Sequence, residues 1–137
     1  MKLLGLALLM VLALPAVAEI RQASGGQLRV LDKMSGVVAD YDLAVGRSQV
    51  QGRLTVQLDD CRYPSDLPNG EAYAHLTILD SDLSAPAFKG WMVASSPALS
   101  ALDNPRYDVW VLRCDVPEAE RTPTADPTTA PAVGSGG

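Results

Sequence analysis

Leu54-Thr55-Val56-Gln57-Leu58-Asp59-Asp60 is the stretch that decides the fold, because apolar and polar residues alternate along it. The same period of two recurs in residues 37–43 (VVADYDL) and 72–79 (AYAHLTIL), and more weakly in residues 27–33. This period is typical of a β-strand that presents one face to a core and the other to water. Met34-Ser35-Gly36 fits a short hairpin loop, since glycine readily adopts a positive φ.

Two later segments, 88–94 (FKGWMVA) and 107–114 (YDVWVLRC), carry apolar residues on both faces. Such runs indicate central strands that are covered on both sides. Between them, Ser96 is a candidate N-cap and Pro97 suits a first helical turn, which predicts one short helix at Pro97–Leu102. The predicted fold class is all-β: a small antiparallel sandwich or barrel of about six strands with one short helix.

The first eighteen residues, MKLLGLALLMVLALPAVA, have the features of a secretory signal peptide. Lys2 precedes an apolar run, and Ala16-Val17-Ala18 is a small-x-small cleavage pattern. The run is shorter than the roughly 20 residues of a membrane span. We therefore predict cleavage before Glu19, a periplasmic location and a mature form that does not span a membrane.

The rest of the chain divides into three parts. Residues 19–26 (EIRQASGG) are expected to be a flexible lead-in, and residues 27–114 to form the β domain. Residues 115–137 are rich in Pro, Thr, Ala and Gly, and bury too little apolar surface to offset their chain entropy. This tail is predicted to be disordered.

The charge of the chain argues against two classes of partner. Without Lys2, the predicted mature chain has 11 − 1 = 10 basic residues against 16 acidic ones, a net charge of −6. Nucleic acids and anionic lipid surfaces are recognised by clustered Lys and Arg, which are absent here. We expect neither as a partner.

Cys61 and Cys114 are the two cysteines of the chain. In an oxidising compartment an isolated pair indicates a disulfide, and no second cysteine lies near either one to form a metal site. We therefore expect a disulfide, and no metal or other cofactor.

Catalytic chemistry has little support in the sequence. His75 is the single histidine, so a serine hydrolase would have to combine it with Ser95 or Ser96. Ser95-Ser96-Pro97 is better explained as a helix start. The carboxylate pairs, such as Asp40 and Asp42, lack calcium-loop spacing and read as solvated strand faces. We expect no catalytic residues and no enzymatic activity.

A partner site is instead expected around the aromatic residues of the last two strands. The candidate residues flank the predicted helix and together supply ring, hydroxyl, amide and charge: Trp91, Ser95, Asn104, Arg106, Tyr107 and Asp108. Ser95, Asn104, Arg106 and Tyr107 are predicted to lie near one end of the sheet. An alternative site for a small molecule or glycan would use Trp91, Tyr107 and Trp110. In a domain with so few aromatic residues, such side chains are more often simply parts of the core.

Residues 88–114, FKGWMVASSPALSALDNPRYDVWVLRC, resemble a family of small exported α-proteobacterial proteins with a domain of unknown function. The resemblance extends upstream to Arg29–Gly36 and the strand that leads to Cys61. Where the family pattern has His before Pro, this chain has Asn104, so no role of that His carries over.

The resemblance implies an envelope domain with paired cysteines, and its gene neighbourhood implies an accessory of a membrane respiratory complex. The first functional hypothesis is therefore a non-enzymatic periplasmic module that binds a protein. A small-molecule or glycan-binding domain is the second, and a serine hydrolase is the third.

Overall fold

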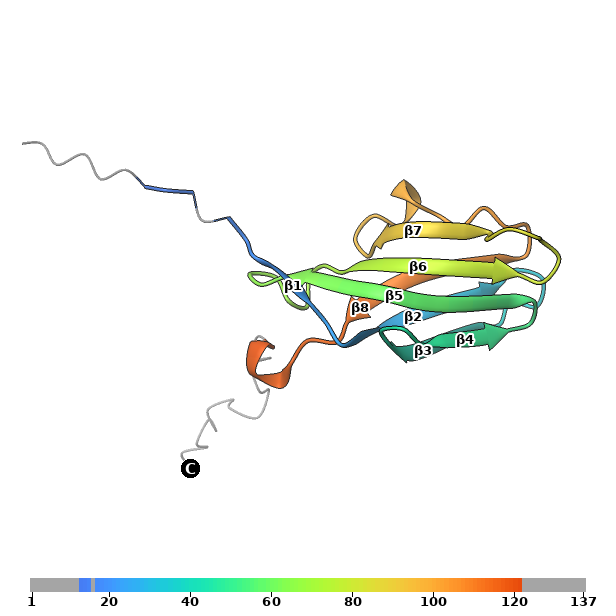
Figure 1. The fold of residues 1–137 in the computed structure, drawn as a ribbon, viewed down its shortest axis with the longest axis horizontal. Coiled ribbons are helices and arrows are strands. Elements are labelled where there is room, and N and C mark those ends of the chain that lie inside the picture. Colours follow the sequence, from blue (N-terminus) through green and yellow to red (C-terminus); the bar gives the residue numbers. More distant parts are fainter. Residues whose placement is uncertain (1–12, 16, 122–137) are drawn as a thin grey trace, which may run out of the picture.

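The computed structural model describes residues 13–15 and 17–121, which form a sandwich of two antiparallel sheets (Figure 1). The larger sheet has the order β1–β5–β6–β7, and β4 also pairs with β5. The smaller sheet has the order β3–β2–β8. The fold is all-β, and the two sheets do not close into a barrel.

The larger sheet contains β1 (Ile20–Gln22), β4 (Ser48–Gln51), β5 (Leu54–Pro64), β6 (Tyr73–Asp80) and β7 (Phe88–Val93). The smaller sheet contains β2 (Gly25–Asp32), β3 (Val38–Ala44) and β8 (Tyr107–Cys114).

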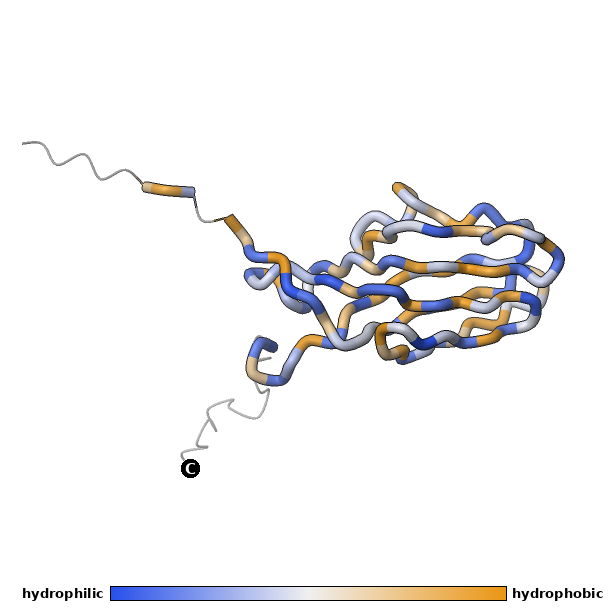
Figure 2. Tube along the Cα trace, viewed as in Figure 1, coloured by the Kyte–Doolittle hydropathy of each residue, from blue (hydrophilic) through white to orange (hydrophobic). Residues whose placement is uncertain are grey.

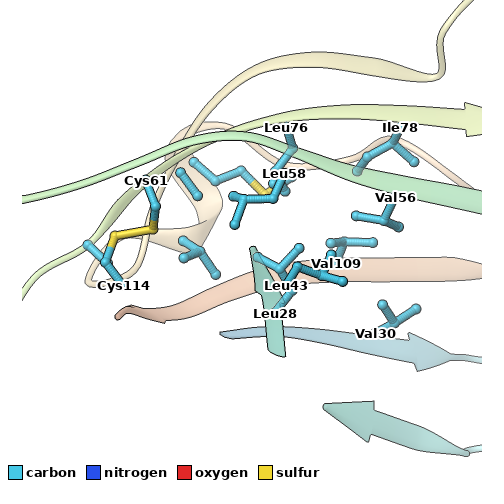
Figure 3. Packing of buried hydrophobic residues seen from close by; sticks show 14 of the residues in the cluster. Leu28, Val30, Leu43, Val56, Leu58, Cys61, Leu76, Ile78, Val109 and Cys114 are labelled. Atoms are coloured by element: carbon cyan, nitrogen blue, oxygen red, sulfur yellow. A yellow bond between two sulfur atoms is a disulfide. The ribbon is translucent and has the colours of Figure 1, made fainter. Parts of the chain in front are cut away.

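Hydrophobic and hydrophilic residues alternate along the strands (Figure 2). The hydrophobic ones form the core between the two sheets. Leu54, Val56 and Leu58 of β5 are fully buried, as their alternation predicts. They pack with the buried residues of β6, β2 and β8 (Figure 3). The predicted hairpin loop is also present, because Gly36 has a φ of 75° between β2 and β3. Burial of these apolar side chains, each worth about 1.5–3 kcal/mol, is the main stabilising term.

A β-bulge in β5 changes which residues face the core. Leu58 pairs with Leu76 and Asp60 pairs with His75, so Asp59 is an extra residue without a counterpart. A bulge of this kind puts two consecutive residues opposite one. Strict alternation from Leu58 would point Cys61 outward, but the extra residue turns it into the core, where it is fully buried.

A second irregularity has the same effect on β8. Gln27 of β2 lies opposite Arg113 and Leu28 lies opposite Val111, which leaves Leu112 as the extra residue. Cys114 consequently faces inward and is buried. The two shifts bring both cysteines between the sheets, where they form the expected disulfide with Cα atoms 5.7 Å apart. The bond joins the larger sheet to the smaller one (Figure 3).

The prediction that both late apolar strands are central is wrong. β7 lies at one edge of the larger sheet and β8 at one edge of the smaller sheet. The central positions belong to β2, β5 and β6. The outward apolar residues of the edge strands include Trp91 and Trp110, which are partly exposed instead of covered by another layer.

Two short strands, β1 and β4, were not predicted from the sequence. β1 lies within residues 19–26, which were expected to be a flexible lead-in, and pairs with the end of β5. β2 also begins in that segment, at Gly25. β4 pairs with the beginning of β5. Both strands are too short to show a period, so their structure comes from hydrogen bonding to a long neighbour.

The first residues of the predicted tail pack on the domain and are not disordered. Val116 is buried, and a 3₁₀ turn follows at Glu118–Glu120. Glu120 accepts hydrogen bonds from Arg21 of β1 at 2.6 Å and from Tyr63 of β5 at 2.5 Å. The hydrogen bond to Tyr63 is the main reason why the pKa of Glu120 lies below its ordinary value, and it raises the pKa of Tyr63. The ordered domain thus extends to Arg121, and the remainder of the predicted tail lies outside the described residues.

The predicted helix is a single 3₁₀ turn at Pro97–Leu99, and the Ser96 side chain makes no capping hydrogen bond to it. This turn belongs to a connection that crosses from β7 in the larger sheet to β8 in the smaller one.

Most of the predicted signal peptide, residues 1–12 and 16, lies outside the described part of the chain. Its described residues form no strand or helix and are exposed. Within the described residues, no helix has the length and apolar character that crossing a bilayer requires.

Candidate interaction surface

The structure separates the residues that were expected to form one site. Asn104, Arg106 and Tyr107 lie at the end of the sandwich where β6 and β2 finish. Ser95 follows β7 at the opposite end, where it binds Glu71 ahead of β6. The prediction that these residues gather at one end of the sheet is therefore wrong. The connection between β7 and β8 runs the length of the sandwich, since β7 and β8 both run toward the end that holds β1 (Figure 1).

Asn104 is buried and fully used inside the protein. Its side-chain nitrogen donates to Asp80 at 3.0 Å, and its side-chain oxygen accepts from the backbone N–H groups of Arg106 and Tyr107. These bonds tie the connection to the ends of both sheets. Asn104 is a structural residue and offers no free polar atom to a partner.

Arg106 and Tyr107 are also committed to the fold. The guanidinium of Arg106 donates to Asp32 at 2.8 Å and lies 5.2 Å from the ring centre of Tyr107. The hydrogen bonds from Arg106 are the main reason why the pKa of Asp32 is lowered to about 2. Tyr107 is 1% exposed, so its prediction as a surface residue is wrong. Asp108 pairs with Lys33 at 3.3 Å and is partly exposed.

Tyr107 also explains a glycine in the β4–β5 turn. Gly52 has a φ of 57°, and a Cβ built on it would lie 3.2 Å from Cζ of Tyr107 and still closer to the hydroxyl oxygen. The left-handed backbone and the close approach of the ring both require glycine at this position.

Trp91 has a different environment, on the outer face of the larger sheet. It is 39% exposed and lines a shallow depression of about 300 Å³ together with Ile20, Arg62 and Tyr73. Each of these residues comes from a different strand: β1, β5, β6 and β7. The depression therefore crosses the whole sheet at the end that carries the disulfide. We call these four residues the Trp91 surface.

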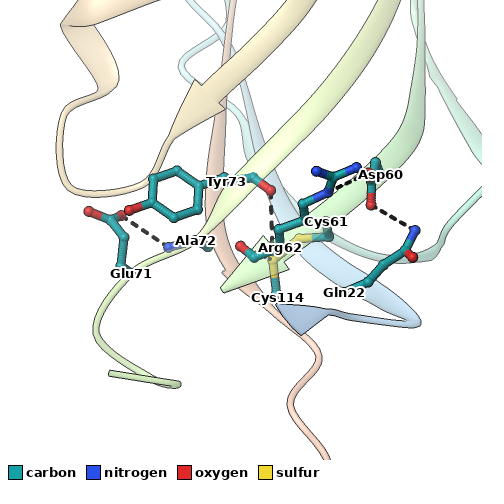
Figure 4. The surroundings of a disulfide bond; sticks show 8 residues. All are labelled: Gln22, Asp60, Cys61, Arg62, Glu71, Ala72, Tyr73 and Cys114. Carbon is teal, nitrogen blue, oxygen red and sulfur yellow. Dashed lines mark hydrogen bonds and ion pairs between the residues drawn. A yellow bond between two sulfur atoms is a disulfide. The ribbon is translucent and has the colours of Figure 1, made fainter. Parts of the chain in front are cut away.

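Neighbouring side chains hold the Trp91 surface in place. Arg62 lies over the Trp91 ring, with its guanidinium carbon 5.1 Å from the ring centre. Asp60 accepts two contacts from Arg62, at 2.8 Å and 2.7 Å, and a hydrogen bond from Gln22 of β1 (Figure 4). The Asp60 carboxylate thereby neutralises the guanidinium and ties β1 to β5.

His75 supports Trp91 from the adjacent strand. The two rings meet edge to face, with centres 5.2 Å apart. Asp59 accepts a hydrogen bond from Thr77 at 2.7 Å and lies 2.9 Å from Nδ1 of His75. Asp59 and Asp60, the pair at the bulge of β5, thus anchor the two neighbours of Trp91, which are His75 and Arg62.

The residues proposed for a serine hydrolase have separate partners. His75 contacts Asp59 and Trp91, whereas the Ser95 hydroxyl donates to Glu71. No hydrogen bond joins Ser95 or Ser96 to His75 within the described residues. Among these residues there is also no group of His, Cys, Asp and Glu side chains suited to hold a metal ion.

The aromatic residues of the alternative glycan site do not meet. Trp91 lies on the outer face of the larger sheet, Tyr107 is in the core and Trp110 is on the outer face of the smaller sheet. The prediction of one site that combines all three rings is therefore wrong.

Sequence reasoning missed three of the four residues of the Trp91 surface. Tyr73 carried a signal, because the alternation in residues 72–79 places it on the wet face. Arg62 had none, since the bulge at Asp59 shifts the alternation before it. Ile20 fell in the segment expected to be a flexible lead-in.

The domain's sequence matches a family of bacterial proteins described as "Uncharacterized protein conserved in bacteria (DUF2155)" over residues 26–114. The chain belongs to this family. The DUF2155 match covers β2 to β8, so it includes Arg62, Tyr73 and Trp91 but not Ile20.

One relative of this DUF2155 protein is "Uncharacterized protein RP359" of Rickettsia prowazekii (strain Madrid E), which is 27% identical over 100 residues. That alignment covers 71% of this chain and 64% of the relative. The chain thus spans less than two thirds of the relative's length. No solved structure matches the chain.

Proposed function

We propose that this DUF2155 domain is a non-enzymatic protein-binding module of the cell envelope, which docks its partner on the Trp91 surface. The observation that carries the proposal is the depression itself, where Trp91, Tyr73 and Ile20 surround an Arg62 whose charge Asp60 already neutralises. Trp, Tyr and Arg are the residues that dominate binding energy in protein interfaces.

The surface has a rigid base, which favours binding. Trp91 and Tyr73 lie on paired strands, and Asp59 and Asp60 fix the groups that contact the Trp91 ring. A side chain that is already ordered loses little conformational entropy when a partner covers it. Ile20 is 51% exposed, so a partner would remove additional apolar surface from water.

A protein partner is favoured over a glycan. Arg62 already lies over the Trp91 ring, so a sugar would have to displace this contact to stack on the same face. The depression is also shallow, whereas small-molecule sites are usually concave and bury most of their ligand. A membrane respiratory complex that faces the periplasm is the class of partner implied by the sequence resemblance.

The test uses two tryptophan variants and an envelope extract of the native cell. Trp91→Ala should lose a discrete partner protein that wild-type protein recovers. Trp110→Ala is the matched control, because Trp110 is a partly exposed tryptophan on the outer face of the other sheet. Both variants are first compared with the wild type by thermal melting.

Recovery that is equal for the wild type and Trp91→Ala would contradict the proposal, as would equal losses in both variants. A partner lost with Trp91→Ala alone, at an unchanged melting temperature, supports it. Mass spectrometry of that partner then shows whether it is a respiratory subunit.

Export is part of the proposed function and has its own test. The disulfide is consistent with an oxidising compartment. N-terminal sequencing of protein from the native cell should begin at Glu19. Intact Met1 on most molecules would contradict the proposed cleavage.

A further inference from the structure

Glu71 lies close in the sequence to Tyr73 of the Trp91 surface, and among the described residues its carboxylate has no ion-pair partner. It lies two residues before Tyr73, which is the first residue of β6 (Figure 4). Its carboxylate accepts hydrogen bonds from the backbone N–H of Ala72 at 3.0 Å and of Ser95 at 3.1 Å. The Ser95 hydroxyl donates a further bond to it. Within the described part of the chain, no Lys, Arg or His forms an ion pair with Glu71.

The environment of Glu71 keeps it ionised. Partial burial opposes the charge, but the hydrogen bonds from Ser95 and Ala72 outweigh it and hold the pKa of Glu71 below its ordinary value. These bonds come from the residue before β6 and from the segment after β7. They fix the carboxylate in position and leave it without a counter-ion.

The other charges near the depression are arranged differently. Arg62 is neutralised by Asp60, so it adds little net charge to the floor. Lys89 lies on β7 two residues before Trp91 and opposite Thr77. It is therefore farther along the sheet from Glu71 than Trp91 is. The whole chain has a net charge of −5. The end of the depression near Tyr73 thus presents an apolar floor beside a fixed negative charge.

We propose that the Trp91 surface binds a partner segment in which an apolar side chain lies next to a Lys or Arg. The apolar side chain packs against Trp91 and Tyr73, and the cation pairs with Glu71. This inference rests on the proposed function and adds the chemistry of the partner. Charge complementarity of this kind chiefly sets specificity and association rate.

The probe is a pair of synthetic peptide libraries. Both have a central Leu, Ile, Phe or Trp and otherwise uncharged positions, but one has Lys and the other Glu beside the central residue. Wild-type protein should bind the Lys library several-fold more tightly than the Glu library, and added salt should reduce that preference.

Three variants locate the effect. Trp91→Ala should lose binding of both libraries. Glu71→Gln keeps a hydrogen-bond acceptor and should bring the Lys preference close to one. Asp103→Asn is the matched control, because Asp103 is exposed and has no ion pair within the described residues, and it should keep the preference.

The outcomes separate this inference from the proposed function. A Lys preference that depends on both Trp91 and Glu71 supports the inference. Binding that depends on Trp91 without a Lys preference overturns the inference and leaves the proposed function standing. Absence of any binding that depends on Trp91 overturns both. If Glu71→Gln fails to fold, the salt dependence of the wild-type preference decides, because a salt-independent preference overturns the inference.

Discussion

Replacing Cys61 and Cys114 together by alanine should reveal how strongly the bond between the two sheets stabilises the domain. The cysteines are 53 positions apart, so the disulfide closes a long loop in the unfolded chain. The chain-entropy relation gives about 4 kcal/mol for a loop of this length at 25 °C. The alanines keep apolar Cβ atoms in a buried site and add no polar group, so the lost cross-link dominates the effect.

The expected loss is large relative to the stability of a small domain. Domains of this size unfold with a free energy of about 5–15 kcal/mol, so the variant retains a fraction of it. For an m-value of about 1–3 kcal/mol/M in urea, the midpoint should fall by roughly 1–4 M. The m-value should increase, because the unfolded variant is less compact than the cross-linked chain.

The assay is urea unfolding followed by tryptophan fluorescence and by circular dichroism. Agreement between the two probes tests whether unfolding is two-state. Wild-type protein that is reduced while unfolded and then blocked at both thiols provides the control for the side-chain replacements. A loss below about 1 kcal/mol would refute the reasoning, because the loop argument would then not describe this domain.

Three further perturbations test the rest of the structure. Gly52→Ala should lower the free energy of unfolding, measured by chemical denaturation, by about 2 kcal/mol or more, because its Cβ meets the buried ring of Tyr107. Gly46→Ala is the matched control, because Gly46 also has a positive φ but has open space around it. Truncation after Asp115 should lower the melting temperature by about 10 °C relative to truncation after Arg121, because it removes a buried valine and the carboxylate that ties β1 to β5; equal melting temperatures would show that this segment contributes nothing. The pKa of Asp32 is depressed to about 2, so its contribution to stability is complete above about pH 4 and disappears as the pH falls toward 2. Urea unfolding across this range should show a weaker pH dependence in Asp32→Asn than in the wild type, and parallel curves would contradict the assignment.

The candidate site shows how far sequence reasoning reached. Trp91 was singled out as a partner residue, and the structure places it on an exposed face. Asn104, Arg106 and Tyr107 have side chains suited to binding, but the fold itself uses the hydrogen-bonding groups of Asn104 and Arg106 and buries the ring of Tyr107. A sequence shows which polar groups exist, whereas only packing shows which of them remain available.

The sequence by itself determined six of the eight strands that the structure describes, together with the alternating residues of the core. A period of two in a strand points alternate side chains to opposite faces, so the buried residues of β5 and β6 follow directly from the order of amino acids. The presence of two cysteines in a chain with a predicted export signal likewise predicted a disulfide. The period of two depends on residues that are close in the sequence, and the disulfide prediction depends on the number of cysteines.

The tertiary structure alone decided the register of the strands and the position of the edges. The extra residues Asp59 and Leu112 are accommodated as bulges because the cysteines after them must face the core to meet across the sheets. Taken by itself, neither strand carries a local signal for its bulge. β1 is a strand because β5 offers it hydrogen-bonding groups, and through that pairing Ile20 joins the Trp91 surface. Pairing between distant segments has an energy that no single segment contains, which is why the surface became visible only in the folded protein.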